Sequence, residues 1–366
     1  MMSTVQILTL AVLACLCLAT VAVAQESQIP PGSERPMFTR MPATLHQPRN
    51  VFEAASTPLQ TWNGSFSFTG TTYNYNMVGT APSTGASTTV QVEIIPIKIV
   101  ISGRGGVQST FDPSHVLSNG KTVTANTVAS PIFASIPFSS GGVNMGTTQY
   151  VDAYQRADFW GTVQSHTGYH VLLGQTVLAE QTLSPPKRAG STGTVFGFNA
   201  GLVDINWFDS QLHTLMTNLN IQPNTFPIFL TYDVYLTQNH SCCIGGYHSS
   251  TGSLSAPQSY AHATYVDHPG SFAQDVSALS HEVGEWMDDP LVVNINGNNT
   301  PCGILENGDP LENNANFGGF PYTANGFTYN LQDLVTLPYF GAPPSTSVNG
   351  EFTFQGEGLT VCQNGA

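Results

Sequence analysis

The sequence predicts an α+β fold with a β-rich N-terminal part, a mixed sheet, backing helices and a loop-rich C-terminal part. The β-branched run Thr88–Ile101 and the apolar run Phe226–Leu236 have the composition of strands. Apolar residues recur at helical spacing in Ile205–Leu219. Asn/Gly-rich segments dominate after Pro290. The chain has 366 residues, of which 41% are hydrophobic, so it can bury a sizeable core.

The N-terminus predicts export. Residues 1–24 resemble a secretory signal peptide, because the apolar run Ile7–Val23 ends at the small-residue site Ala22-Val23-Ala24. A lipoprotein cleavage site at Cys15 is the alternative. Residues 25–58 are Pro-rich and lack periodicity, which predicts a leader or extended arm without a core of its own. We therefore expect a secreted protein, extracellular or periplasmic, with no membrane association after the signal is removed.

Residues 59–270 are predicted to form a β-rich lobe with two helices. A hairpin is expected over Thr61–Val78, and Pro96 predicts that the strand Thr88–Ile101 lies at an edge or contains a bulge. The other expected elements are a helix at Thr147–Val163, a strand at Tyr169–Leu178, a helix at Ile205–Leu219, a strand at Phe226–Leu236 and an edge strand at Ser259–Asp267. Residues 271–366 are expected to form a second lobe, in which a helix ends at Pro290 and loops follow.

The mature chain contains four cysteines, Cys242, Cys243, Cys302 and Cys362. An even number in an oxidising compartment predicts two disulfide bonds. Adjacent cysteines rarely bridge each other. Cys242 and Cys243 are therefore expected to pair with Cys302 and Cys362, in either order, and a structural zinc site formed by all four is the alternative.

Charge is distributed unevenly along the chain. All nine Lys and Arg residues lie at or before Arg188, whereas 15 of the 23 Asp and Glu residues follow it. No basic stripe is present, which excludes a nucleic-acid partner. A bound metal ion or bulk cations would supply the counter-charge for clustered carboxylates. An acidic, solubilising surface is the alternative for most of these residues.

The sequence HEVGE at residues 281–285 lies within the helix predicted before Pro290. Residues four apart lie on one face of a helix, so His281 and Glu285 can hold one divalent ion. Glu282 is rotated beside them, where its carboxylate could take a proton from a metal-bound water. Gly284 is expected to leave the helix surface open next to the ligands, although glycine costs about 1 kcal/mol of helix propensity.

HEVGE resembles the HExxH helix of zincin-type zinc metallopeptidases, with Glu in place of the second His. The resemblance implies a zincin-like fold, His281 and Glu285 as zinc ligands, Glu282 as general base, and a peptide or protein substrate. Gluzincins add a downstream Glu ligand followed by an Asp. Glu306 is thus the expected third ligand, and Asp309 is its competitor or a hydrogen-bonding partner of His281. The resemblance covers one helix and one loop.

The Glu-for-His replacement departs from the zincin pattern. Two carboxylates would make the ion a poorer Lewis acid, and they admit Mn or Ca as well as the expected Zn. We expect a secreted metal-dependent hydrolase, most simply a metallopeptidase. The alternative is a non-catalytic surface or cell-wall protein that binds Ca or Zn. The helix itself could instead be an exposed one with solvated acids. His248, in an expected loop, and His262 and His268 are further candidate ligands or oxyanion stabilisers.

Overall fold

The computed structural model describes residues 37–68, 70–239, 241–292, 305–337, 340–342, 347–348 and 351–356. The expected signal peptide lies outside the described residues, as do Cys302 and Cys362. The division into two lobes near residue 270 stays a prediction. Within the described ranges, no helix combines the length and apolar character needed to cross a membrane.

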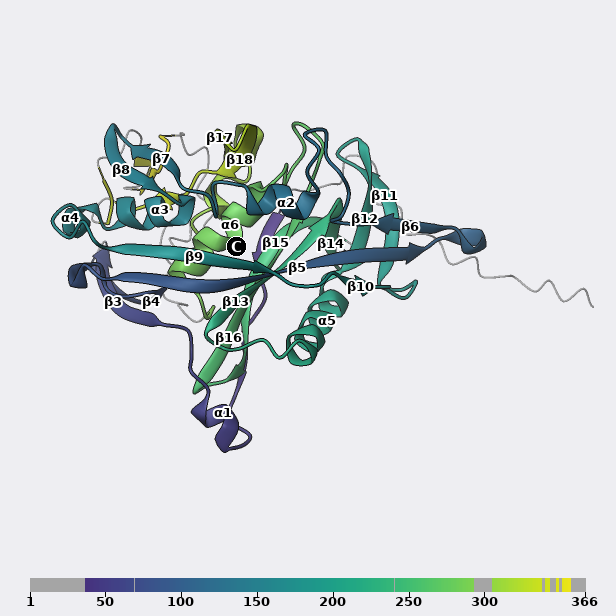
Figure 1. Cartoon of the computed structure of the whole chain (residues 1–366), viewed down its shortest axis with the longest axis horizontal. Helices are drawn as coiled ribbons and strands as arrows, with labels where there is room; N and C mark the ends of the chain where they lie inside the picture. Colours follow the sequence, from purple (N-terminus) through teal and green to yellow (C-terminus); the bar gives the residue numbers. More distant parts are fainter. Residues whose placement is uncertain are drawn as a thin grey trace, which may run out of the picture.

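Twelve strands form one mixed sheet. They are β1 (Met37–Arg40), β2 (Thr44–His46), β5 (Ser87–Ser102), β6 (Gln108–Phe111), β9 (His170–Val177), β10 (Gln181–Leu183), β11 (Gly190–Val195), β12 (Phe198–Asp204), β13 (Thr225–Tyr232), β14 (Val234–Gln238), β15 (Ser241–Ser253) and β16 (Ala256–Tyr265). The main strand order is β10-β5-β13-β16-β15-β14-β12-β11 (Figure 1). Strands β6 and β9 also pair with β5, and β1 and β2 pair with β15.

Smaller elements surround this sheet. The hairpins are β3 (Thr61–Phe68) with β4 (Thr71–Val78), β7 (Ile136–Ser140) with β8 (Val143–Thr148), and β17 (Gly319–Ala324) with β18 (Phe327–Gln332), and a three-stranded sheet contains β19 (Val335–Thr336), β20 (Ser347–Val348) and β21 (Glu351–Thr353). The helices are α1 (Val51–Ala55), α2 (Val123–Val128), α3 (Tyr150–Asp158), α4 (Trp160–Val163), α5 (Ile205–Asn218) and α6 (Ser277–Asp288). The 3-10 turns are η1 (Pro82–Thr84), η2 (Arg104–Gly106), η4 (Asp309–Leu311) and η5 (Ala315–Gly318).

The predicted zincin-like α+β fold is wrong. The structure is mostly β, with 45% strand and 21% helix, and a single large sheet dominates it. The sequence prediction missed strands that lack long apolar runs. Strand β15, with the sequence SCCIGGYHSSTGS, was expected to be a loop, yet it lies between β14 and β16 and most of its residues are buried. Small Ser, Gly and Cys residues allow close packing on both faces of such a strand.

The strand predicted at an edge, β16, and the strand predicted either at an edge or with a bulge, β5, are both interior. Strand β16 lies between β13 and β15, and β5 is bonded on both sides. Pro96 is tolerated in β5 because of a change of partner strand. Pairing with β9 ends at Ile94, and pairing with β10 begins at Ile97. The missing N–H of proline therefore falls in the gap between two partners. The predicted hairpin at Thr61–Val78 is confirmed as β3 and β4.

The sheet has a hydrophobic core on each face. Alternate residues of β5, Val90, Val92 and Ile94, belong to the core that includes α3 and α6. The residues from Ile95 to Ile101 that alternate with them belong to the core beneath α5. Figure 1 shows α5 on one side of the strands and α6 on the other. All residues of α6 are buried, so the alternative of an exposed helix with solvated acids is wrong.

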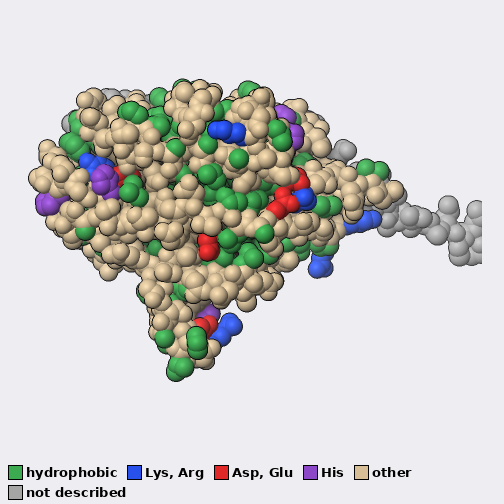
Figure 2. Space-filling view, viewed as in Figure 1, with side chains coloured by type: hydrophobic (Ala, Val, Ile, Leu, Met, Phe, Trp, Pro, Cys, Tyr) green, Lys and Arg blue, Asp and Glu red, His purple; other side chains and the backbone are tan. Residues whose placement is uncertain are grey.

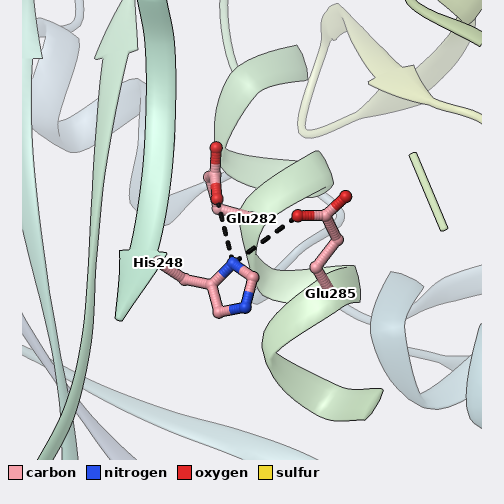
Figure 3. A group of neighbouring side chains, drawn as sticks. All are labelled: His248, Glu282 and Glu285. Carbon is pink, nitrogen blue, oxygen red and sulfur yellow. Dashed lines mark hydrogen bonds and ion pairs between the residues drawn. The ribbon is translucent and has the colours of Figure 1, made fainter. Parts of the chain in front are cut away.

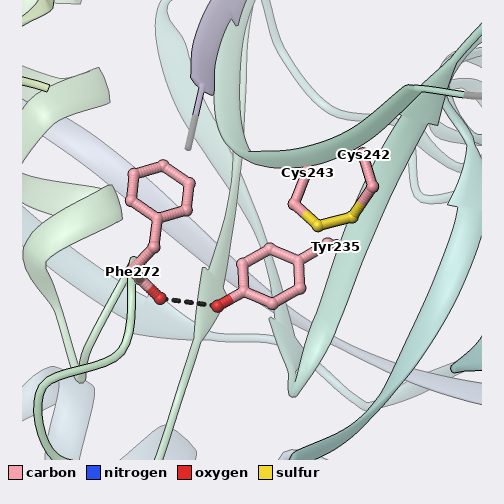
Figure 4. The surroundings of a disulfide bond; sticks show 4 residues. All are labelled: Tyr235, Cys242, Cys243 and Phe272. Atoms are coloured by element: carbon pink, nitrogen blue, oxygen red, sulfur yellow. Dashed lines mark hydrogen bonds between the residues drawn. A yellow bond between two sulfur atoms is a disulfide. The ribbon is translucent and has the colours of Figure 1, made fainter. Parts of the chain in front are cut away.

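Cys242 and Cys243 form a disulfide bond with each other, across the cis peptide bond that joins them. The expected pairing of these residues with Cys302 and Cys362 is therefore wrong, since each sulfur already has its adjacent partner. The bridge lies on β15 beside Tyr235, whose hydroxyl donates to the carbonyl oxygen of Phe272 at 2.6 Å (Figure 4).

Gly284 serves packing between α6 and the segment after β18. A Cβ at this position would lie 2.6 Å from Cδ1 of Leu334, inside van der Waals contact. The expectation that Gly284 leaves an open surface beside the ligands is therefore wrong, because Leu334 fills that space.

Gly284→Ala should destabilise the protein by about 1–3 kcal/mol, because the added methyl group overpacks the contact with Leu334. Because the two residues are in contact, Gly284→Ala combined with Leu334→Ala should cost less than the sum of the two single substitutions. Gly161→Ala in α4 is the matched control, since a Cβ there meets nothing within 4 Å. Urea unfolding of the wild type, the two single variants, the double variant and the control measures the effect. Equal stability of the Gly284 and Gly161 variants would contradict this account.

Candidate metal centre

Many acids of the C-terminal half are inside the protein. Of the 15 acidic residues that follow Arg188, the structure describes the burial of 13, and eight of these are buried: Asp233, Asp275, Glu282, Glu285, Asp288, Asp289, Glu306 and Asp333. The face in Figure 2 shows only scattered acidic and basic side chains. A solubilising surface therefore does not explain this half of the chain, and the buried acids need other partners.

Helix α6 is fixed by an aromatic contact on its sheet-facing side. The indole of Trp286 stacks on Phe226 with ring centroids 3.8 Å apart, and its Nε1 donates to Oγ of Ser259 at 3.0 Å. His281 and Glu285 project towards the segment that begins at residue 305. The i, i+4 spacing thus brings imidazole and carboxylate to one place, as the sequence predicts.

The two expected ligand atoms face each other without a hydrogen bond. Nε2 of His281 lies 3.0 Å from Oε1 of Glu285 and 3.5 Å from Oδ1 of Asp309. Neither Nε2 of His281 nor Oε1 of Glu285 finds a hydrogen-bond partner among the described residues, although both atoms are buried. Donor atoms of these three side chains all lie within 4.8 Å of one another. Such convergence is compatible with the binding of one cation.

Gln332 fixes which nitrogen of His281 faces the acids. The amide Nε2 of Gln332 donates to the carbonyl oxygen of Phe317 at 3.0 Å, so its Oε1 points at Nδ1 of His281 and accepts from it. Nδ1 therefore carries the proton, and Nε2 presents a lone pair to Glu285 and Asp309. A lone pair facing carboxylate oxygens is repulsive unless a proton or a cation lies between them.

Burial favours the neutral forms of the titratable side chains in this cluster. It lowers the pKa of His281 to about 4, against the opposing effect of Glu312, so the imidazole is neutral near pH 7. Burial, reinforced by neighbouring acids, raises the pKa values of Glu282 and Glu285 well above their usual range. The pKa of Glu312 is raised to about 7, again chiefly by burial. Without a cation, these carboxyl groups retain protons.

Of the two downstream candidates, Asp309 lies closer to the ligand position. It belongs to the group of donor atoms formed with His281 and Glu285, whereas Glu306 instead contacts the carboxyl group of Glu285. The alternative role for Asp309, a hydrogen bond to Nδ1 of His281, is taken by Gln332. The structure thus brings the four predicted residues together, and of the two downstream acids it places Asp309, the expected competitor of Glu306, nearer to Nε2 of His281.

His248 forms a second cluster that shares Glu285. Its Nδ1 lies 3.4 Å from Oε2 of Glu282 and 3.5 Å from Oε2 of Glu285 (Figure 3). Strand β15 approaches closely because residue 246 is glycine. A Cβ there would meet Oε1 of Glu282 at 2.6 Å. His248 therefore holds the carboxylate of Glu282 on the side of α6 that faces the sheet.

Asn307 anchors the segment that carries Glu306 and Asp309. Its Nδ2 donates to Oδ2 of Asp288 at 2.7 Å and to the hydroxyl of Tyr154 at 2.9 Å. Since Asp288 is the last residue of α6, one side chain ties this segment both to α6 and to α3. The positions of the downstream acids are thus set by a buried hydrogen-bond network.

Sequence reasoning missed Gln332, Glu312 and Phe38. The ring of Phe38 stacks on His281 with centroids 3.8 Å apart, and its backbone N–H donates to Glu312. No spacing signal links these residues to residues 281–285, since they approach only through the fold. The other histidine candidates lie elsewhere. His262 contacts Oγ1 of Thr231 at 3.0 Å, and His268 stacks on Phe198.

Comparison with known proteins identifies no relative. The chain matches no protein-family model, no curated protein and no solved structure.

Metal-free protein should lose stability as the pH rises from 5 to 8. Folding raises the pKa values of Glu282, Glu285 and Glu312, so the folded state binds more protons than the unfolded state above about pH 4.5. Each such group contributes at most about 1.4 kcal/mol per pH unit in its window. Urea unfolding in EDTA at pH 5, 6, 7 and 8 measures the slope, which added zinc should reduce. Metal-free protein that is equally stable at pH 5 and pH 8 would contradict this prediction.

Proposed function

We propose that this protein binds one divalent metal ion through His281, Glu285 and Asp309. The observation that supports the proposal most directly is the convergence of Nε2 of His281 with Oε1 of Glu285 and Oδ1 of Asp309, at 3.0 and 3.5 Å. One nitrogen and two oxygen donors suit zinc, and the anionic set also accepts manganese or calcium. A dication would satisfy the lone pair of His281 and offset the charge of the surrounding acids.

We further propose that the site serves hydrolysis, with a peptide or protein as substrate. Bound metal would supply Lewis acidity and a water molecule of lowered pKa. Glu282 is buried beside Glu285 and is held by His248, so its carboxylate can accept a proton and later release it. Gln332 keeps the imidazole of His281 in the tautomer that binds. The signal-like N-terminus supports secretion, where such a hydrolase would act.

A non-catalytic metal-binding protein is the second candidate. Its support is the burial of the site, since the side chains of His281 and Glu282 are 0% exposed and that of Glu285 is 1% exposed. Only Asp309, at 30%, reaches solvent appreciably. In this alternative the ion would stabilise the surface or cell-wall protein, and no substrate would approach.

Substitution of the proposed ligands should weaken metal binding, with the largest effects at the residues whose donor atoms lie nearest one another. His281→Gln is expected to weaken zinc binding at least 100-fold, and Asp309→Asn should weaken it more than Glu306→Gln. His213→Gln, in the outer helix α5, is the control and should bind normally. Calorimetric titration of EDTA-treated protein measures the affinities. Wild-type protein that takes up no zinc, manganese or calcium would refute the proposed site.

Glu282→Gln separates the two candidate functions. It should reduce peptide hydrolysis by at least 100-fold while leaving metal content intact, since Gln cannot accept the proton. Glu53→Gln in the exposed helix α1 is the matched control. The assay is a broad library of quenched fluorescent peptides with zinc-loaded protein. If wild-type protein binds metal and gains thermal stability but cleaves nothing, the non-catalytic function is supported instead.

A further inference from the structure

The N-terminal arm, defined here as β1 and β2 with the residues between them, is an extended peptide bound to the sheet. It adds in parallel to β15, along the edge that β14 leaves uncovered. Thr39 pairs with Tyr247, and Arg40 pairs with His248. The segment from Thr44 to His46 continues the pairing as far as Ser253. Addition of a strand to a sheet edge is a common way for a protein to bind an extended peptide.

One side chain of the arm is buried in the metal-site region. Phe38 is 5% exposed, and its ring contacts His281 at 3.8 Å and Phe272 at 4.7 Å between centroids. Its backbone N–H donates to Oε1 of Glu312. We call the surroundings formed by Phe272, His281 and Glu312 the Phe38 pocket. Met37 and Thr39, on either side, are only partly buried.

The Phe38 pocket is built by residues that the arm does not supply. The carbonyl of Phe272 accepts from the hydroxyl of Tyr235, whose ring lies beside the Cys242–Cys243 bridge (Figure 4). Gly245 of β15 leaves room for the ring of Phe272, since a Cβ at residue 245 would lie 2.9 Å from Cε1 of that ring. The pocket thus combines a fixed aromatic wall with a carboxylate that accepts a backbone N–H.

The recognition of the arm is largely independent of its sequence. Backbone pairing holds Thr39, Arg40 and the segment from Thr44 to His46, and the N–H of Met41 donates to the carbonyl of His248 at 3.2 Å. Main-chain hydrogen bonds of this kind are available to any extended peptide, and the pocket selects one bulky side chain. The arm also places the ring of Phe38 against His281, one of the proposed ligands.

We propose that the free edge of β15 and the Phe38 pocket form a binding site for an extended peptide with an aromatic side chain, which the N-terminal arm occupies in cis. This inference rests on the proposed function only for the fate of the bound peptide. The site gives the substrate class: an extended, unfolded segment that places Phe, or a similar ring, beside His281. The arm is then a self-inhibitor that has to leave before another peptide can enter.

A tethered arm competes with an added peptide at a high effective concentration, so the test uses a variant whose arm binds the pocket more weakly. Three full-length proteins are compared: wild type, Phe38→Ala, and Gln47→Ala as an exposed control in the same segment. The probe is a fluorescein-labelled peptide with the sequence of residues 35–48, followed by anisotropy. We expect Phe38→Ala to bind the probe at least tenfold more tightly than the other two proteins. Equal affinity for all three proteins would overturn the proposal.

A second preparation covers the case in which Phe38→Ala fails to fold. Helix α1 follows the arm and has no buried residue, and Phe52 within it is 86% exposed. Replacing α1 with the recognition sequence of a specific protease allows the folded protein to be cut there. The cut protein should exchange its own arm for the labelled peptide. A peptide carrying Phe38→Ala should bind at least tenfold more weakly, whereas one carrying Gln47→Ala should bind as the parent does.

The outcomes separate this inference from the proposed function. Probe binding without hydrolysis supports the peptide site and counts against a hydrolase. Hydrolysis of library peptides, with no effect of Phe38→Ala on probe binding or on rate, supports the hydrolase and overturns the peptide site. Failure of the cut protein to discriminate between the parent peptide and its Phe38→Ala form also overturns it.

Discussion

The candidate site depends on the orientation of His281, because the lone pair on its Nε2 points at two carboxyl groups. Gln332 accepts from Nδ1 of His281 and leaves Nε2 directed at Glu285 and Asp309 inside the protein. This arrangement is stable only with a proton or a cation between the imidazole nitrogen and the carboxyl oxygens, because buried like charges and lone pairs repel one another. A proton can fill that role, and a dication would fill it in the proposed metal site. Under the proposed function, metal binding would therefore compete with protonation of the cluster.

The surrounding architecture keeps that cluster from relaxing. Helix α6 cannot rotate away, since Trp286 is stacked on Phe226 on its sheet side. The downstream acids cannot withdraw, since Asn307 binds Asp288 and Tyr154. A Cβ at residue 308 would lie 2.2 Å from Nδ1 of His281, so the chain passes the imidazole at a distance that only glycine permits. Preorganisation of this kind lowers the cost of binding an ion.

The site was more predictable than the fold. Helical spacing alone placed His281 beside Glu285, because residues four apart share one face of a helix. The resemblance to gluzincins pointed to Glu306 as the third ligand and to Asp309 as its competitor. The large sheet was missed because β15 is built from small polar residues that resemble a loop. Gln332 and Phe38 could not be found from sequence. They lie 51 and 243 residues from His281, and only the packed sheet brings them together.

The long strand β5 has a consequence for how the molecule unfolds. Its even-numbered residues from Val90 to Ile94 belong to one core, and its odd-numbered residues from Ile95 to Ile101 belong to the other. A single 16-residue strand therefore contributes buried side chains to both hydrophobic cores. Unfolding of either core would displace β5 and so remove side chains from the other core as well. Heating should therefore disrupt both cores in one cooperative transition rather than in two separate steps.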